Sequence, residues 1–138
     1  MPQKNKKDPD SQILFADNPS IAARRAHYLD IVVDVQAVLE SWRDSLFSFE
    51  WLTPEGAIKA AEDLSAAERA KRQQVEDKIA SGQPLDKPIL GIGIQDNVEI
   101  GSGRAEFLTL AARGLRAIPV HVPQGNKRDF APFEARIT

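Results

Sequence analysis

The stretch from Lys87 to Pro123 restricts the folds open to this chain more than any other part of it. Residues 88–94 alternate branched apolar side chains with small ones, as a short strand does. After the turn residues Gln95-Asp96-Asn97, Val98 and Ile100 continue the same alternation. The two glycines on one face of the first strand suggest that another backbone or a ligand lies close to it. We therefore expect a β-hairpin in this stretch.

A helix and a further strand are expected directly after the hairpin. Residues 103–113 carry apolar side chains at helical spacing, and Gly114 follows as a typical helix-ending residue. Ile118, Val120 and Val122 then alternate with their neighbours, as in a strand. A hairpin, a helix and a strand in so short a stretch favour an α/β (α+β) domain.

The glycine-rich bend Gly101-Ser102-Gly103-Arg104 lies where the second strand gives way to the helix. The first turn of a helix has free backbone N–H groups, which can bind a phosphate or another anion. These four residues are therefore the predicted phosphate- or nucleotide-binding site. Two alternatives remain open: a purely structural bend with Arg104 paired to Glu99 or Glu106, and a contact with a DNA backbone.

Three residues near this bend are candidates for catalysis. Glu99 or Glu106 could handle a proton or a metal ion, although Glu106 would act as a base only if burial raised its pKa. His121 is out of phase with the apolar residues of its strand. It is therefore expected to be a surface or hydrogen-bonded histidine more often than a catalytic one. The sequence singles out none of the three as catalytic.

The composition excludes several classes of protein. The chain contains no cysteine, which rules out disulfides, a thiolate catalyst and zinc-finger spacing, and its two histidines are too far apart to suggest a metal site. A formal net charge of −2 argues against non-specific coating of nucleic acid. No apolar run approaches the ~20 residues of a membrane span, and the N-terminus lacks the apolar stretch of a signal peptide. We therefore expect a cytoplasmic protein without membrane contact.

The N-terminal third is predicted to be a flexible tail (residues 1–16) followed by a long amphipathic helix over residues 17–46. Asp17-Asn18-Pro19-Ser20 is a typical helix start. An apolar seam follows at helical spacing and consists of Tyr28, Val32, Val35, Leu39, Trp42 and Leu46. The seam is expected either to pack on the protein's own sheet or to form a homodimer through residues 20–46.

The middle of the chain is expected to add a short strand and two helices. Phe47, Phe49 and Trp51 alternate with polar residues, which predicts a strand. Thr53-Pro54-Glu55 predicts a helix that runs to about Asp63. Ser65 and Glu68 form a capping box for another helix, which ends near Gly82.

Two groups of residues in this region could bind a partner. Arg69, Lys71 and Arg72 form a basic helix face, either solvated or docked on nucleic acid or an acidic protein. Phe47 and Phe49 belong to a partner-binding surface if their segment is a sheet edge. At the other end of the chain, residues 125–138 form a charged C-terminal tail, with Phe130 and Phe133 as clamps onto the body.

The order of these features from Ile79 to Val122 resembles the ParB/sulfiredoxin superfamily. The residues that carry the resemblance are Gly82–Leu85, Pro88–Leu90, Ser102–Leu108 and Arg113–Val122. It implies one compact domain over residues 17–124, with a small mixed sheet surrounded by helices. The superfamily includes partition proteins that bind and hydrolyse CTP, ParB-like nucleases, sulfiredoxin, small nucleotide-using kinases and plasmid fertility-inhibition proteins.

The chain departs from the superfamily's phosphate motif. Gly103 and Arg104 are kept, but Ala105 stands at the family's histidine position and Glu106 at its second basic position. Glu106 suits the positive end of a helix dipole and repels a phosphate. Sulfiredoxin chemistry is excluded because it requires a cysteine.

The resemblance therefore implies two functions. The first is a non-enzymatic regulator from a plasmid, phage or other mobile element, which binds a protein of the DNA-transfer or partition machinery, as fertility-inhibition proteins do. The second is a ParB-like nuclease or nucleotidase that binds a nucleotide with Mg²⁺, or DNA, at the bend. A DNA-binding partition accessory ranks last because no helix-turn-helix is recognisable.

Overall fold

A four-stranded sheet forms the centre of the computed structural model, which describes residues 13–136. Its strands lie in the order β2-β6-β4-β5. Their bounds are Tyr28–Asp34 for β2, Ile89–Ile92 for β4, Val98–Ser102 for β5 and Ala117–Pro123 for β6. The β2–β6 and β4–β5 pairs are antiparallel and the β4–β6 pair is parallel. The protein is therefore a mixed α/β domain.

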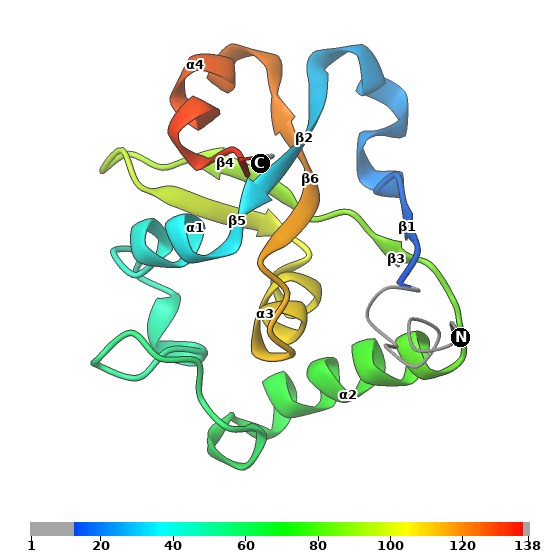
Figure 1. Cartoon of the computed structure of the whole chain (residues 1–138), viewed down its shortest axis with the longest axis vertical. Helices are drawn as coiled ribbons and strands as arrows, with labels where there is room; N and C mark the ends of the chain where they lie inside the picture. The colour runs from blue at the N-terminus through cyan, green and yellow to red at the C-terminus, as the bar shows by residue number, and fades with distance from the viewer. Residues whose placement is uncertain (1–12, 137–138) are drawn as a thin grey trace, which may run out of the picture.

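Four α-helices accompany the sheet within residues 13–136. They are α1 (Val35–Trp42), α2 (Ala66–Ala80), α3 (Arg104–Ala112) and α4 (Lys127–Phe130). In Figure 1, α3 lies between the sheet and α2, α1 lies beside β5, and α4 lies at the opposite end of the molecule from α2. None of the described helices combines the length and apolar character needed to cross a bilayer.

The hydrophobic core lies where α1 and α3 meet the sheet. On α3, Phe107, Leu108 and Leu110 are fully buried. Trp42 at the end of α1 and Trp51 in the following loop are buried with them. Large aromatic side chains contribute the most buried apolar area per residue, so these two tryptophans hold the α1 end of the domain together.

The predictions for the stretch from Lys87 to Pro123 are confirmed. The hairpin forms from β4 and β5, α3 follows, and β6 closes the sequence. Local signals were sufficient here because turn residues separate the hairpin strands and Gly114 ends the helix.

The long helix predicted over residues 17–46 is wrong. The segment instead forms the 3₁₀ helix η3 (Pro19–His27), then strand β2, then the short helix α1. The run Ile31-Val32-Val33 is β-branched and favours a strand. Asp34 then caps α1 by accepting a hydrogen bond from the Ala37 N–H. Val33 is buried while Val32 is exposed, so β2 follows a period of two. The homodimer helix expected over residues 20–46 therefore does not form.

Two predictions in the middle of the chain are also wrong. The strand expected over Phe47–Trp51 is a turn containing the 3₁₀ helix η4 (Ser48–Glu50), which the Ser48 hydroxyl stabilises by donating to nearby carbonyls. The helix expected from Thr53 to Asp63 is mostly loop, with only η5 (Ala61–Asp63) helical. Backbone hydrogen bonds from Thr53 to Ala57 and from Gly56 to Thr53 close a tight turn where that helix was expected to begin.

Helix α2 is confirmed, but its cap differs in one respect. The Ser65 hydroxyl accepts a hydrogen bond from the Glu68 N–H, as a capping box requires. The Glu68 carboxylate accepts instead from the Trp51 indole N–H at 2.9 Å. The capping glutamate therefore ties α2 to the core.

Both described ends of the chain pack against the body. Strand β1 (Phe15–Ala16) pairs in parallel with β3 (Leu85–Asp86). The prediction of a flexible tail over residues 1–16 is therefore wrong for residues 13–16, and residues 1–12 of that prediction lie outside the described residues. At the other end, Phe130 is fully buried and meets the Phe133 ring edge-on, in the manner predicted for clamps. The 3₁₀ helices η6 (Gln124–Asn126) and η7 (Ala131–Phe133) flank α4.

Candidate functional site

The predicted phosphate-binding bend is formed, and packing alone accounts for its glycine. Gly103 has a φ of 80° and directly precedes α3. A Cβ at this position would lie 2.8 Å from the Pro88 Cα. The close approach expected at the strand glycines Gly91 and Gly93 is not made by a backbone: a Cβ at Gly91 would meet nothing within 4 Å, and one at Gly93 would meet the Glu99 side chain.

A cavity of about 390 Å³ lies between this bend and α2. The start of α3 has no side-chain cap, so its first N–H groups have no side-chain acceptor. Lys71 and Lys78 line the cavity from α2, but Glu68 and Glu106 line it too. The cavity can hold an anion only against the repulsion of two carboxylates.

Arg104 is engaged by its own protein. Its Nη1 donates to the Glu50 Oε1 at 2.6 Å. Its guanidinium lies 5.3 Å from the Phe47 ring centroid and 5.8 Å from that of Trp42, within cation–π range. The predicted pairing with a nearby acid therefore occurs, but Glu50 is the partner and not Glu99 or Glu106. The turn at η4 brings Glu50 there from 54 residues away.

The three catalytic candidates are not brought together. Glu99 accepts hydrogen bonds from the Ser45 hydroxyl and the Asn97 amide. Glu106, on α3, lines the cavity, and His121 is buried within a separate polar cluster. No hydrogen bond or ion pair joins any two of them in the described part of the chain, so they form no catalytic arrangement.

His121 belongs to a polar cluster that the sequence did not reveal. Its Nδ1 lies 2.7 Å from the Asp30 Oδ1, and its Nε2 accepts a hydrogen bond from the Asn18 N–H at 3.0 Å. Asp17 Oδ1 lies 4.0 Å from Nε2. The expectation of a hydrogen-bonded histidine is confirmed. In the sequence, Asp17 and Asn18 are recognisable only as a helix start, and Asp30 lies within the segment predicted to be helical.

Asp17, Asp30 and His121 offer ligand atoms within 4.8 Å of one another, which is close enough to share a metal ion. The donors are already in use, however. Arg25 bonds to both carboxylates, and Lys87 lies within 3.7 Å of Asp17 and 3.5 Å of Asp30. The lone pair of His121 Nε2 already accepts a hydrogen bond from the Asn18 backbone N–H. The cluster is therefore a network of ion pairs and hydrogen bonds within the protein, and these contacts account for its residues without a metal ion.

The pKa of Asp30 reflects this network. Partial burial raises the pKa of the carboxyl, because burial penalises its charge. The hydrogen bond to His121 and the charges of Lys87 and Arg25 act in the other direction and outweigh burial. The pKa of Asp30 therefore lies below its ordinary value.

Glu68 is stabilised as an anion in a similar way. Burial of its carboxyl raises the pKa. Hydrogen bonds from the Trp51 indole and the Lys71 ammonium lower it by more, helped by the charges of Lys71 and Arg104. The pKa of Glu68 is therefore held below its ordinary value, which does not suit a proton-accepting base at neutral pH.

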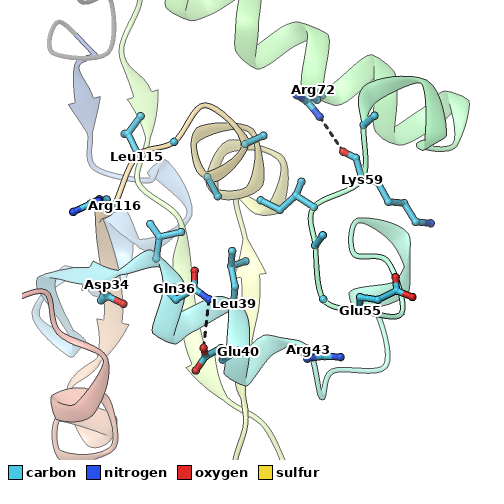
Figure 2. A pocket seen from close by; sticks show the side chains of 18 residues that line it. Asp34, Gln36, Leu39, Glu40, Arg43, Glu55, Lys59, Arg72, Leu115 and Arg116 are labelled. Carbon is cyan, nitrogen blue, oxygen red and sulfur yellow. Dashed lines mark hydrogen bonds between the residues drawn. The ribbon is translucent and has the colours of Figure 1, made fainter.

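A second, more open cleft of about 980 Å³ lies between α1, the loop over residues 55–60 and the end of α3. Figure 2 shows Asp34 and Arg116 on one side of it and Glu55, Lys59 and Arg72 on the other. These charged side chains lie at the edge of the cleft and are not directed toward a common point. The cleft therefore lacks the convergent polar groups of a small-molecule site.

The basic face of α2 is largely committed to internal contacts. Arg69 donates to the Ala61 and Leu64 carbonyls, and Arg72 donates to the Lys59 carbonyl. Lys71 pairs with Glu68 at 3.3 Å. Hydrogen bonds to the preceding loop therefore explain these arginines without a nucleic acid.

The aromatic surface is the predicted site that remains open to solvent. Leu46 is 80% exposed, Phe47 is 51% exposed and Phe49 is 66% exposed. We call residues 45–50 the aromatic loop. It is a turn and not the sheet edge that the sequence suggested. The exposure of Leu46 was missed because its spacing placed it on the seam of a helix that does not form.

Comparisons with known proteins add no assignment. No protein-family model matches the chain, and no curated protein or solved structure matches it. Function is therefore inferred from the geometry of residues 13–136.

Proposed function

We propose that this protein is a small non-enzymatic regulator from a plasmid or phage, which acts in the cytoplasm by binding a protein of the DNA-transfer or partition machinery. The observation that carries the proposal is the aromatic loop, where Leu46, Phe47 and Phe49 expose large apolar side chains close together in sequence. Adjacent exposed apolar side chains are typical of protein-binding surfaces. Aromatic anchors supply much of the binding energy at such surfaces.

The aromatic loop is held in a fixed shape before any partner binds. The Ser45 hydroxyl donates to Glu99 at 2.7 Å and accepts from the Phe47 N–H at 3.2 Å. At the other end of the loop, Glu50 pairs with Arg104, which also lies over the Phe47 ring. A surface that is ordered in advance loses less conformational entropy on binding.

The same contacts argue against an enzyme. Arg104 is the side chain best placed to bind a phosphate at the bend, and Glu50 neutralises it. The acidic candidates for proton transfer lie apart. A regulator that acts by binding a protein needs neither a free phosphate-binding arginine nor a free proton-transferring acid.

The proposal is tested by expressing the protein in cells that carry a conjugative plasmid or a low-copy plasmid with a partition system. We expect it to lower transfer frequency or raise plasmid loss. The double variant Phe47→Ser/Phe49→Ser should lose at least about tenfold of that effect, as expected for removal of two binding anchors. Leu14→Ser, which changes an exposed apolar residue elsewhere, is the matched control and should keep the effect.

Two outcomes would contradict this proposal. One is a wild-type protein that changes neither transfer nor partition. The other is a double variant that is folded, by circular dichroism and urea titration, and as active as the wild type.

A second candidate function is a ParB-like nuclease or nucleotidase. The cavity beside the uncapped start of α3, with Lys71 and Lys78 on its wall, favours it. Calorimetry with ATP, CTP, ADP and short DNA, with and without Mg²⁺, tests it directly. Binding should weaken in Lys78→Ala and persist in Lys127→Ala, a lysine on α4. No heat above background with any ligand would exclude this function.

A further inference from the structure

The segment from Ile13 to His27, which we call the N-terminal arm, makes three of its hydrogen bonds to the body through Asn18. The Asn18 side-chain amide donates to the Lys87 carbonyl at 3.0 Å and to the Ser102 hydroxyl at 3.2 Å. Its backbone N–H donates to His121 Nε2. Further contacts come from buried Ile21, from the short β1–β3 pairing, from the Arg25–Asp30 and Asp17–Lys87 ion pairs, and from the Gln124 amide, which donates to the Ala26 carbonyl. Asn18 therefore connects the arm to both β6 and the Gly101–Arg104 bend.

The hydrogen bonds of His121 fix its protonation state. A nitrogen that accepts from a backbone N–H carries no proton, so Nε2 is unprotonated while Asn18 is in place. The single ring proton then lies on Nδ1 and is donated to Asp30 at 2.7 Å. His121 is fully buried, and no water can substitute for either partner without a local opening.

Adding a proton to His121 would place two donors opposite each other. The new Nε2–H would face the Asn18 N–H, and the bond that holds the arm would be lost. Asp17 Oδ1, 4.0 Å from Nε2, is the acceptor within reach. Forming that bond requires the Asp17-Asn18 peptide to move, because its N–H now occupies the position in front of Nε2.

We propose that His121 is a proton-controlled latch: neutral His121 holds the N-terminal arm on the body, and protonated His121 releases Asn18 and bonds to Asp17. Two carboxylates lie next to this ring, and two cations pair with those carboxylates. Asp30 comes from β2, Asp17 from the residues before η3, Arg25 from η3 and Lys87 from the β3–β4 link. Two negative and two positive charges largely offset each other. The position of the Asn18 N–H therefore decides whether His121 Nε2 can carry a proton.

Release of Asn18 also alters the bend. Ser102 loses its hydrogen-bond donor, and the Lys87 carbonyl next to Pro88 loses its side-chain partner. Pro88 is the residue that contacts Gly103. Release of Asn18 would therefore remove two hydrogen bonds next to the residues that precede α3.

The experiment is an NMR titration of the full chain from about pH 7.5 to about pH 5.5, where histidines titrate and aspartates keep their charge. We expect the Asn18 amide signal to shift with the same midpoint as the His121 ring. His27, the exposed second histidine, is the internal reference. The protection factors of the arm amides should fall about tenfold over the titration, the effect of losing one hydrogen bond.

Two variants separate the latch from general acid effects. In His121→Gln the side chain stays neutral, so the protection factors of the arm should not change between the two pH values. His27→Gln should behave as the wild type does. An unchanged Asn18 amide while His121 titrates, a His121 that stays neutral to the lowest pH, or an unaltered pH effect in a folded His121→Gln would each overturn the proposal. If His121→Gln does not fold, the wild-type titration still decides.

Discussion

Replacing Gly103 with alanine should destabilise the protein more than any other glycine-to-alanine change near the bend. The backbone of Gly103 has a φ of 80°, a conformation that alanine adopts only with strain. The added Cβ would also lie 2.8 Å from the Cα and 3.1 Å from the Cβ of Pro88. Pro88 cannot easily retreat, because its carbonyl accepts a hydrogen bond from the His121 N–H.

Each contribution has an approximate size. The left-handed backbone costs an L-residue about 1–2 kcal/mol, and the lower entropy of the unfolded alanine chain offsets about 0.4–1 kcal/mol of that. Crowding against a packed backbone adds about 1–3 kcal/mol. Gly103→Ala should therefore lower the free energy of unfolding by about 1–5 kcal/mol.

Two other glycines provide matched controls. Gly114 has a φ of 94° but nothing within 4 Å of a new Cβ, so Gly114→Ala should cost only the backbone strain, about 1 kcal/mol. At Gly101 the nearest atom is the Ile89 carbonyl oxygen at 3.6 Å, an ordinary contact. Gly101→Ala should therefore stay within about 0.5 kcal/mol of the wild type.

Urea unfolding followed by tryptophan fluorescence measures all three variants, with equal m-values as the check for an unchanged unfolded state. The difference between Gly103→Ala and Gly114→Ala isolates the contact with Pro88. Equal losses in these two variants would refute the reasoning, since crowding would then contribute nothing. Gly103 would be explained by its backbone conformation alone.

Three further predictions concern the polar contacts and the C-terminal clamp. A double-mutant cycle of Glu50→Gln and Arg104→Gln in urea should give a coupling energy of about 1 kcal/mol, the size expected for a half-exposed pair; zero coupling would contradict the ion pair. Glu68 has a lowered pKa, so its contribution to stability is present above the pKa of an unfolded glutamate, about 4.3, and is lost as the pH falls through the lower folded value. Urea titrations between about pH 3 and 7 should show less acid destabilisation in Glu68→Gln than in the wild type, and an identical pH dependence would contradict the assignment. Phe130→Ala should cost about 3–5 kcal/mol, measured by thermal or urea unfolding, whereas a loss below about 1 kcal/mol would show that the clamp is dispensable.

The parts of the fold that could be predicted depend on local signals. The β4–β5 hairpin is specified by its turn residues, and α2 by the Ser65 cap. The predicted helix over residues 17–46 failed because Tyr28, Val32 and Val35 follow a helical spacing, and that spacing was followed in place of the strand preference of the β-branched run Ile31-Val32-Val33. Pairing with β6 decides between the two, and the sequence of β2 alone does not show that pairing.

The candidate site was predicted only in part. The bend and the pairing of Arg104 with an acid were expected, but the identity of that acid was not. Glu50 lies in a turn whose position depends on burial of Trp51 in the core. The cluster around His121 was missed because Asp17, Asp30 and Lys87 meet it from three separate segments, and no spacing rule connects them.

The sequence by itself determined the hairpin, helix and strand of the Lys87–Pro123 stretch and the absence of thiol chemistry. These follow from nearest-neighbour backbone preferences and from residue chemistry, both of which are local. Only the tertiary structure decided that Arg104 pairs with Glu50, that the aromatic loop is exposed and that His121 accepts a hydrogen bond from Asn18. Each of these depends on contacts between distant segments, whose energies become available only when the core has packed.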